Sequence, residues 1–287
     1  MLKPPRTIDE QIQLLKIRNI VIDSAEAAKN FLENNNYYRL MGYAFQFKKD
    51  KDYYIPGTKF STIAGIYNFD KLLRRITLSL IEELEISFKT KLAYFLSHKY
   101  GSECYLKKEI FIKNESYLDF KNIIKKNIKQ SNSESFVKHH LIKYDDKFPF
   151  WVLIEILSFS AISKFFENLN NLDKNHFSKS YYKYDAVFIE NWIHHFSVLR
   201  NTCAHYGRIY NKNLLPVLKF LEEDKNKIIR TTKLFDSLFI LNKIFFNRDL
   251  WSNFLERLNN LIIEYKNIID LNLIGFPDNY LSVLKNA

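Results

Sequence analysis

The longest helical pattern in the chain lies between residues 62 and 99. Apolar residues recur there at the 3.6-residue spacing of a helix that packs along one side; they are Ile66, Phe69, Leu72, Leu73, Ile76, Leu80, Leu84, Phe88 and Leu92. We expect Ser61 to cap the start of this helix and Gly101 to end it. At 1.5 Å per residue, an unbroken helix of this length would extend roughly 57 Å.

Shorter helices are predicted on both sides of this segment. Thr7 and Glu10 have the spacing of a capping box, which opens a helix through Ile17, and Ser24 can cap a second helix. The remaining predicted helices cover 116–129, 134–143, 151–169, 186–205, 232–246 and 249–269. The segment 151–169 is apolar on several faces, which predicts a single buried central helix.

Glycine and proline are scarce in this chain. It has 6 Gly and 6 Pro among 287 residues, about 2% each, where average usage is roughly 7% and 5%. All-β and linker-rich proteins need both residues in their turns, so the composition argues against these classes. The apolar fraction of 47% excludes a disordered chain. We predict an all-α fold with long central helices and additional N- and C-terminal helices.

The chain carries a formal charge of +11, which permits nucleic acid as a partner. Lysine outnumbers arginine 33 to 10, and asparagine is also frequent. Because this bias is typical of an A+T-rich bacterial genome, it weakens the charge as a sign of polyanion binding. The surplus is concentrated in residues 89–147, where 13 Lys face 7 acidic residues. That region is one candidate for contacts with an RNA backbone.

Most sequence patterns of cofactor or metal chemistry are missing. Cys104 and Cys203 have no metal-ligand spacing and form no disulfide framework, and the seven histidines show no H-E-x-x-H pattern. The chain has no glycine-rich phosphate loop, no N-terminal apolar leader and no apolar run long enough for a membrane span. We therefore expect a cytoplasmic protein that uses no cofactor, binds no metal and does not enter a membrane.

One stretch near the end of the predicted helix 186–205 combines groups suited to phosphate chemistry. Arg200 and Asn201 precede His205 in an R-N-x-x-x-H pattern, and Arg208 follows. Asn201, His205 and Arg208 share one helix face if the helix continues through this turn. The stretch supplies a bidentate cation, an amide and an imidazole of a kind that changes charge near neutral pH. We expect Gly207 to end the helix.

The same residues also fit a purely structural interpretation. Arginine and histidine are favoured in the last turn of a helix by its macrodipole. Asn201 can cap or bridge, and His205 can be a satisfied helix-end residue. The local sequence alone favours this structural interpretation.

Five blocks occur in a fixed order along the chain and carry a family resemblance. They are T-I-D-E-Q-I-Q-L-L at 7–15, N-Y-Y-R-L-M-G-Y at 36–43, Y-N-F-D-K-L-L-R at 67–74, P-F-W-V-L-I-E with S-F at 149–159, and L-R-N-T-C-A-H at 199–205. With these blocks the chain resembles the Abi-like abortive-infection family of the AbiD/AbiF type, whose members belong to the HEPN superfamily. The order of five blocks is far more specific than one R-N-x-x-x-H pattern.

The resemblance implies a HEPN-like helical bundle and a metal-independent ribonuclease that acts as an anti-phage toxin. It implies that Arg200 stabilises charge on the scissile phosphate, that His205 is the general acid or base, and that Asn201 positions His205 or the phosphate. The expected products carry a 2′,3′-cyclic phosphate and a 5′-hydroxyl. Two motifs face each other in such proteins, so a homodimer with a composite site is expected. A small noncoding RNA is the expected neutralising partner.

Several assignments stay open at this point. Arg208 and Asn211 are candidate substrate-binding residues that extend the site along the RNA backbone, or ordinary helix-end surface residues. Glu82 and Glu85 either orient Arg200 across the bundle or lie on a solvated face.

The organisation of the chain and its function also have alternatives. Residues 58–287 are predicted as the HEPN-like core, and residues 1–57 as a helical region packed on it or as an accessory arm. The N-terminal region also has candidates for stacking on RNA bases, namely Tyr37, Tyr38 and Arg39. For the two tyrosines we favour the alternative, packing inside the helical bundle. The alternative function is a non-catalytic RNA-binding module of a defence or toxin–antitoxin system, and a protein–protein scaffold is a third.

Overall fold

The computed structural model describes residues 4–224 and 227–286, and in these residues it confirms the all-α prediction. About 69% of the chain is helical, and no strand occurs in the described part. The α-helices are α1 (Ile8–Ile17), α2 (Ala25–Asn34), α3 (Tyr37–Ala44), α4 (Phe60–Tyr100), α5 (Asn114–Gln130), α6 (Ser135–Lys143), α7 (Phe150–Leu153), α8 (Phe159–Glu167), α9 (Asn171–Tyr182), α10 (Ala186–Ala204), α11 (Leu234–Ile244), α12 (Arg248–Tyr265) and α13 (Tyr280–Asn286).

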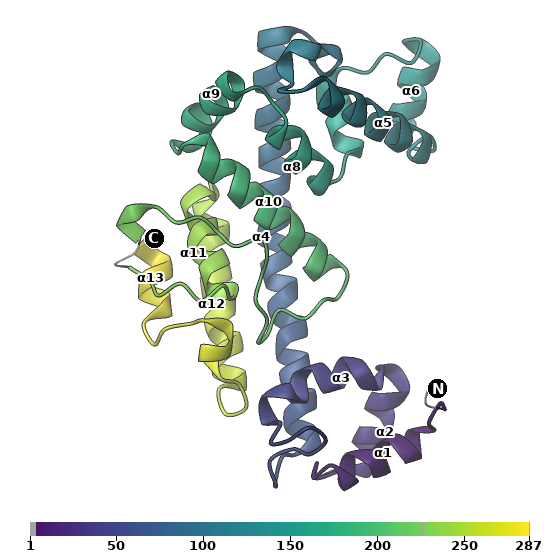
Figure 1. Ribbon diagram of the computed structural model, residues 1–287, viewed down its shortest axis with the longest axis vertical. Coiled ribbons are helices and arrows are strands. Elements are labelled where there is room, and N and C mark those ends of the chain that lie inside the picture. The colour runs from purple at the N-terminus through teal and green to yellow at the C-terminus, as the bar shows by residue number, and fades with distance from the viewer. Residues whose placement is uncertain (1–3, 225–226, 287) are drawn as a thin grey trace.

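The long helix α4 organises the molecule. Its 41 residues form the axis of the fold in Figure 1, with α1–α3 around its beginning, α5–α9 around its end, and α10–α13 alongside its middle. Every residue of the predicted apolar series except Leu72 is buried, which confirms the 3.6-residue pattern. Gly101 ends the helix with a φ of 90°, a left-handed conformation that glycine adopts without a steric cost.

The start of α4 differs from the prediction. Lys59 is the N-cap residue, and Ser61 lies inside the helix. The free backbone N–H of Ser61 donates to the Asp23 carboxylate at 3.2 Å, and the Ser61 hydroxyl donates to the same group. A carboxylate from the loop after α1 therefore satisfies the first turn of α4, and it joins the N-terminal region to the core.

The predicted single helix over 151–169 is wrong. The segment is divided into α7, a short 3₁₀ turn (Ile154–Ile156) and α8. Leu157 has an extended backbone, and the Ser158 hydroxyl accepts a hydrogen bond from Ala161 N at 3.2 Å to cap α8. Serine offers the backbone this alternative to a continuous helix. Trp151, in α7 before the break, is 52% exposed.

The remaining predicted helices are present, and three further helices appear. Thr7 and Glu10 form the expected capping box at α1, and the Ser24 hydroxyl accepts from Ala27 N to cap α2. The predictions for 116–129, 134–143, 186–205, 232–246 and 249–269 correspond to α5, α6, α10, α11 and α12. Helices α3, α9 and α13 were not predicted. No helix in the described part of the chain is long and apolar enough to cross a membrane.

A buried histidine connects α10 to the C-terminal helices. His195 is 1% exposed, its Nδ1 lies 2.7 Å from the Pro216 carbonyl oxygen, and its Nε2 lies 2.8 Å from the Ser237 hydroxyl. Because a carbonyl only accepts, we infer that Nδ1 carries the hydrogen and that Nε2 accepts from Ser237. Burial lowers the pKa of His195 to about 4, so the neutral ring is the form that the fold accommodates.

Acidification is therefore expected to destabilise the protein through His195. In the unfolded chain His195 takes up a proton near the ordinary pKa of 6.5, whereas in the folded chain it does so only near pH 4. Stability from this group is present above pH 6.5 and is lost as the pH falls toward about 4. The loss amounts to roughly 3 kcal/mol. Denaturant unfolding at several pH values measures it. The His195→Gln variant should show a shallower pH dependence than the wild type, and His194→Gln, which alters an exposed neighbour, should not. Equal slopes for all three proteins would contradict this assignment.

Candidate active site

The helix that bears Arg200 ends in a tight turn at His205. Helix α10 stops at Ala204, and His205 is its C-cap. Tyr206 has a left-handed φ of 60°, its N–H donates to Cys203 O at 3.2 Å, and Gly207 N–H donates to Thr202 O at 2.7 Å. This pair of bonds is the Schellman arrangement. The imidazole of His205 is consequently exposed at the carboxyl end of the helix.

Gly207 follows the helix end as predicted, but for a different physical reason. The left-handed residue is Tyr206, so Gly207 is not needed for its φ. A Cβ at position 207 would lie 2.9 Å from the Thr202 carbonyl oxygen. Glycine is required because the backbone approaches the end of α10 closely.

Arg200 is held by a buried carboxylate on α4. Its Nε lies 3.3 Å from Glu85 Oε2, and Lys89 Nζ lies 2.8 Å from the other oxygen of Glu85. The Arg200 side chain is 34% exposed and that of Glu85 is 10% exposed. The Nε atom itself is buried and makes no well-aligned hydrogen bond. The exposed part of Arg200 therefore lies elsewhere on its side chain, and two cations share one carboxylate.

The structure distinguishes between the two glutamates that were weighed as partners of Arg200. Glu85 faces α10 and contacts Arg200, which matches the interpretation that a glutamate orients Arg200 across the bundle. Glu82 is exposed, which matches the other interpretation. The two residues are three positions apart on the same helix and provide a matched pair for mutagenesis.

Asn201 binds a neighbouring helix through its side chain. Its Nδ2 donates to the Ser160 hydroxyl on α8 at 3.0 Å. The backbone carbonyl oxygen of Asn201 accepts a hydrogen bond from the backbone N–H of His205 at 2.9 Å. The side chain therefore joins α10 to α8, while the backbone fixes the position of the His205 residue.

Arg208 does not share a helix face with Asn201 and His205. The helix ends before it, so the assumption that the helix continues through this turn is wrong. The Arg208 guanidinium donates to the carbonyl oxygen of Gly42 and lies 5.9 Å from the centroid of the Tyr43 ring. Asn211 follows at a left-handed φ of 48° and is half-buried.

A buried aspartate on α4 anchors the segment after His205. Asp70 is fully buried, and its Oδ1 accepts the N–H groups of Ile209 at 3.2 Å and Tyr210 at 2.8 Å. Its Oδ2 accepts the Tyr43 hydroxyl at 2.5 Å and pairs with Arg74. Burial raises the pKa of this carboxyl, and the Arg74 charge and the three donors oppose that rise.

Helix α3 contributes a second contact to the same turn. Arg39 donates to the carbonyl oxygen of Tyr206 at 2.7 Å, directly after His205. Its neighbours Tyr37 and Tyr38 differ: Tyr37 is half-buried and accepts a hydrogen bond from Arg18 at 3.2 Å, whereas Tyr38 is 81% exposed. The positioning role of Arg39 was missed because its partner is 167 positions away along the chain.

The histidine, cysteine and acidic residues of the described chain do not form a metal centre. No group of three or more of them is placed to hold a metal ion within residues 4–224 and 227–286. The buried cysteine Cys203 lies on α10, next to the site, and burial raises the pKa of its thiol to about 12.

Replacing Asp70 with asparagine is expected to destabilise the fold strongly. The change leaves the buried Arg74 without its counter-charge and places an amide among donors, for a loss of about 3–5 kcal/mol. Denaturant unfolding measures the loss. Asp278→Asn, at an exposed aspartate, is the matched control and should stay within about 0.5 kcal/mol of the wild type. Two equally mild variants would show that Asp70 is not an anchor.

Comparison with known proteins agrees with the family resemblance. The sequence model of the Abi-like protein family matches residues 30–211. This range contains α3, α4 and α10, and it ends just after the segment that Asp70 anchors. No curated protein and no solved structure was found to match the chain. Because the family match covers more than half of the sequence, the chain belongs to the Abi-like protein family.

Proposed function

We propose that this Abi-like protein is an anti-phage toxin that cleaves RNA without a metal ion. The observation that carries the proposal is the geometry at the end of α10. His205 is exposed at the carboxyl end of the helix, and its side chain makes no hydrogen bond to another described residue. One turn earlier, Arg200 is held by Glu85 and remains one-third exposed. A cation paired with a buried carboxylate, five residues before an accessible imidazole, suits phosphodiester chemistry.

The proposed reaction is an internal transfer within RNA. A histidine takes the proton from a ribose 2′-hydroxyl, the 2′-oxygen attacks the adjacent phosphorus, and the bond to the 5′-oxygen breaks. A second proton donor protonates that 5′-oxygen. The products are a 2′,3′-cyclic phosphate and a 5′-hydroxyl. Arg200 stabilises the negative charge that builds up on the phosphate oxygens. Asn201 is proposed to set the position of His205 through its backbone.

The two proton transfers support a homodimer. One imidazole cannot remove and donate a proton at the same moment, and the chain has one R-N-x-x-x-H motif. A second copy supplies the second His205 if the two motifs face each other. This composite site is the one implied by the resemblance to the HEPN superfamily, and closed two-fold dimers are the commonest protein oligomers.

The other expected contacts remain part of the proposal. Arg208 and Asn211 are proposed to lie along the RNA backbone next to the site. The contact of Arg208 with Gly42 uses part of its five-donor guanidinium. We propose that the protein acts in the bacterial cytoplasm, where a small noncoding RNA neutralises it.

One observation favours a second function, a non-catalytic RNA-binding module. The ion pair between Arg200 and Glu85 makes Arg200 part of the framework between α10 and α4. In that case Arg200 and His205 contribute to RNA binding or to the stability of the bundle, and no bond is cleaved. The nuclease cleaves the bound RNA, whereas the module leaves it intact.

An RNA cleavage assay in the presence of EDTA separates the two functions. The wild type is expected to cut RNA and to leave 2′,3′-cyclic phosphate ends. The His205→Ala and Arg200→Ala variants should lose at least about 100-fold in rate, since each removes a group that acts on the transition state.

Two exposed residues provide the controls for this assay. His194→Ala alters a histidine on the same helix, and Arg257→Ala alters an arginine on α12. Both should keep the activity of the wild type. RNA that binds tightly to the wild type without being cut would support the module instead. Full toxicity of His205→Ala in cells would exclude the proposed mechanism.

Glu85→Gln tests the positioning of Arg200. Loss of the charged partner allows the guanidinium to move, and a misplacement of about 1 Å costs on the order of 100-fold in rate. We expect kcat to fall while KM changes little, because RNA binding uses many other contacts.

Glu82→Gln is the matched control, since Glu82 is exposed on the same helix. It should leave both kinetic constants near those of the wild type. Equal effects of the two variants, or a rise in KM alone for Glu85→Gln, would show that Glu85 does not position Arg200 for catalysis.

A further inference from the structure

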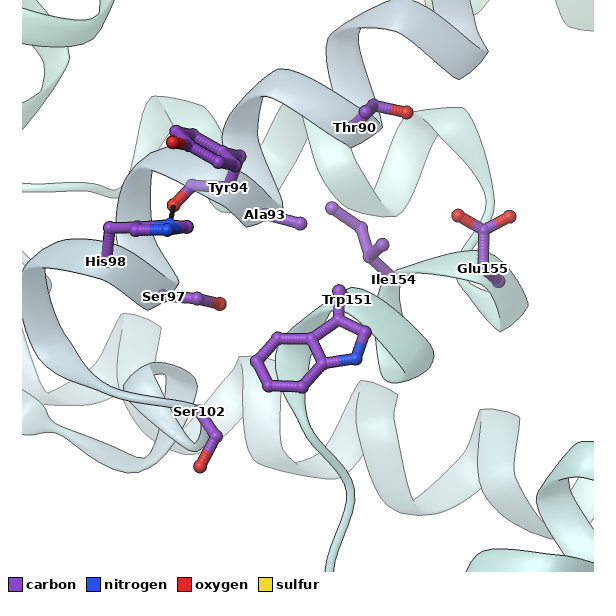
Figure 2. Close-up of a pocket in the computed structure, with 9 residues that line it drawn as sticks. All are labelled: Thr90, Ala93, Tyr94, Ser97, His98, Ser102, Trp151, Ile154 and Glu155. Atoms are coloured by element: carbon purple, nitrogen blue, oxygen red, sulfur yellow. Dashed lines mark hydrogen bonds between the residues drawn. The ribbon is translucent and has the colours of Figure 1, made fainter.

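Two neighbouring hollows share one tryptophan at the distal end of α4. The first has a volume of about 570 Å³ and is lined by Tyr94, His98, Trp151 and Glu155, among others (Figure 2). The second has a volume of about 410 Å³ and is lined by Tyr144 and other residues. Both include Ser102 and Trp151 in their walls. Trp151 therefore stands between two parts of one groove.

Aromatic rings are present in both parts of this groove. Trp151 is 52% exposed and Tyr94 is 59% exposed. In the first hollow the ring centroids of Tyr94 and His98 are 3.9 Å apart, and both rings lie across from Trp151 (Figure 2). In the second hollow the rings of His140 and Tyr144 are stacked at 4.9 Å. Three aromatic surfaces thus follow one another along the groove.

The groove lies along the part of α4 that follows Glu85, the partner of Arg200. On α4, the exposed Ile86 directly follows Glu85, and positions 86, 90, 93 and 97 share one helix face. Thr90, Ala93 and Ser97 on this face line the first hollow. Tyr94 is nine residues beyond Glu85, which places it roughly 14 Å further along the helix and on the opposite side of it. The groove and the candidate active site therefore share α4 and lie within a few helical turns of each other along its axis.

We propose that this groove binds the bases of single-stranded RNA, with Trp151 inserted between two successive bases. The proposal rests on RNA being the ligand of the neighbouring site. Every base has a flat face that stacks on an aromatic ring, so such a groove holds a strand of any sequence. Duplex RNA hides these faces. Lys147 lines the second hollow and can pair with a phosphate, while the Glu155 carboxylate can accept hydrogen bonds from base amino groups.

Tryptophan fluorescence reports on this groove selectively. The chain has three tryptophans, and the other two, Trp192 and Trp251, are 0% and 4% exposed. The probe is a single-stranded oligoribonucleotide of about 12 nucleotides with 2′-O-methyl riboses, which lack the attacking hydroxyl. Binding is therefore measured without cleavage. The oligonucleotide should quench the wild-type fluorescence, and a duplex of the same sequence should not.

Variants of Trp151 give the decisive comparison. Trp151→Leu should abolish the quenching and raise the Kd by roughly 5- to 100-fold, the range that one stacked base contributes. Trp151→Phe should keep most of the affinity. Tyr53→Leu alters a residue that is 47% exposed near the other end of α4, and it should bind like the wild type. Circular dichroism and the denaturation midpoint confirm that each variant is folded.

The possible results separate this proposal from the proposed function. Quenching that depends on Trp151, in a protein that cuts no RNA, supports the groove and contradicts the nuclease. Cleavage with an unchanged KM and Kd in Trp151→Leu supports the nuclease and overturns the groove. A Trp151→Leu protein that loses self-association but binds RNA normally also overturns it, because the groove is then a protein interface.

Discussion

The buried carboxylate of Asp70 is the interaction on which the geometry of the candidate site depends. It binds two consecutive backbone N–H groups from the segment after α10, a hydroxyl from α3 and the charge of Arg74. A carboxylate without partners is expensive to bury, so these donors are required if it is to stay ionised. Their convergence determines where the chain runs after His205. The exposed imidazole therefore depends on a residue in the interior of the protein.

A second carboxylate on the same helix has a comparable role for Arg200. Glu85 pairs with Arg200 on α10 and with Lys89 on its own helix. Glu85 thus connects α4 to the last turns of α10, and Asp70 connects it to the segment beyond them. Asn201 adds a third connection through Ser160 on α8. The motif residues belong to one helix end, but their partners come from two other helices, α4 and α8.

The sequence was sufficient for the features that depend on neighbouring residues. The spacing of apolar side chains predicted α4, and capping residues predicted the starts of α1 and α2. It was insufficient where one segment suits two conformations. At Ser158 the apolar run also suits a continuous helix, but the serine hydroxyl caps a new helix and divides the run. It was also insufficient for long-range pairs. Asp70 and Tyr210 are 140 positions apart, and nothing near either residue reveals the other.

The continuity of α4 gives these elements a fixed register. Asp70, Glu85 and Tyr94 lie on one unbroken helix, so their separations follow from the residue count alone. One inserted residue between Glu85 and Tyr94 would rotate the aromatic groove by about 100° relative to Arg200. Seven inserted residues, close to two full turns, would nearly restore the direction but lengthen the path by roughly 10 Å. The length of this helical segment is therefore constrained by geometry, independently of the identity of its side chains.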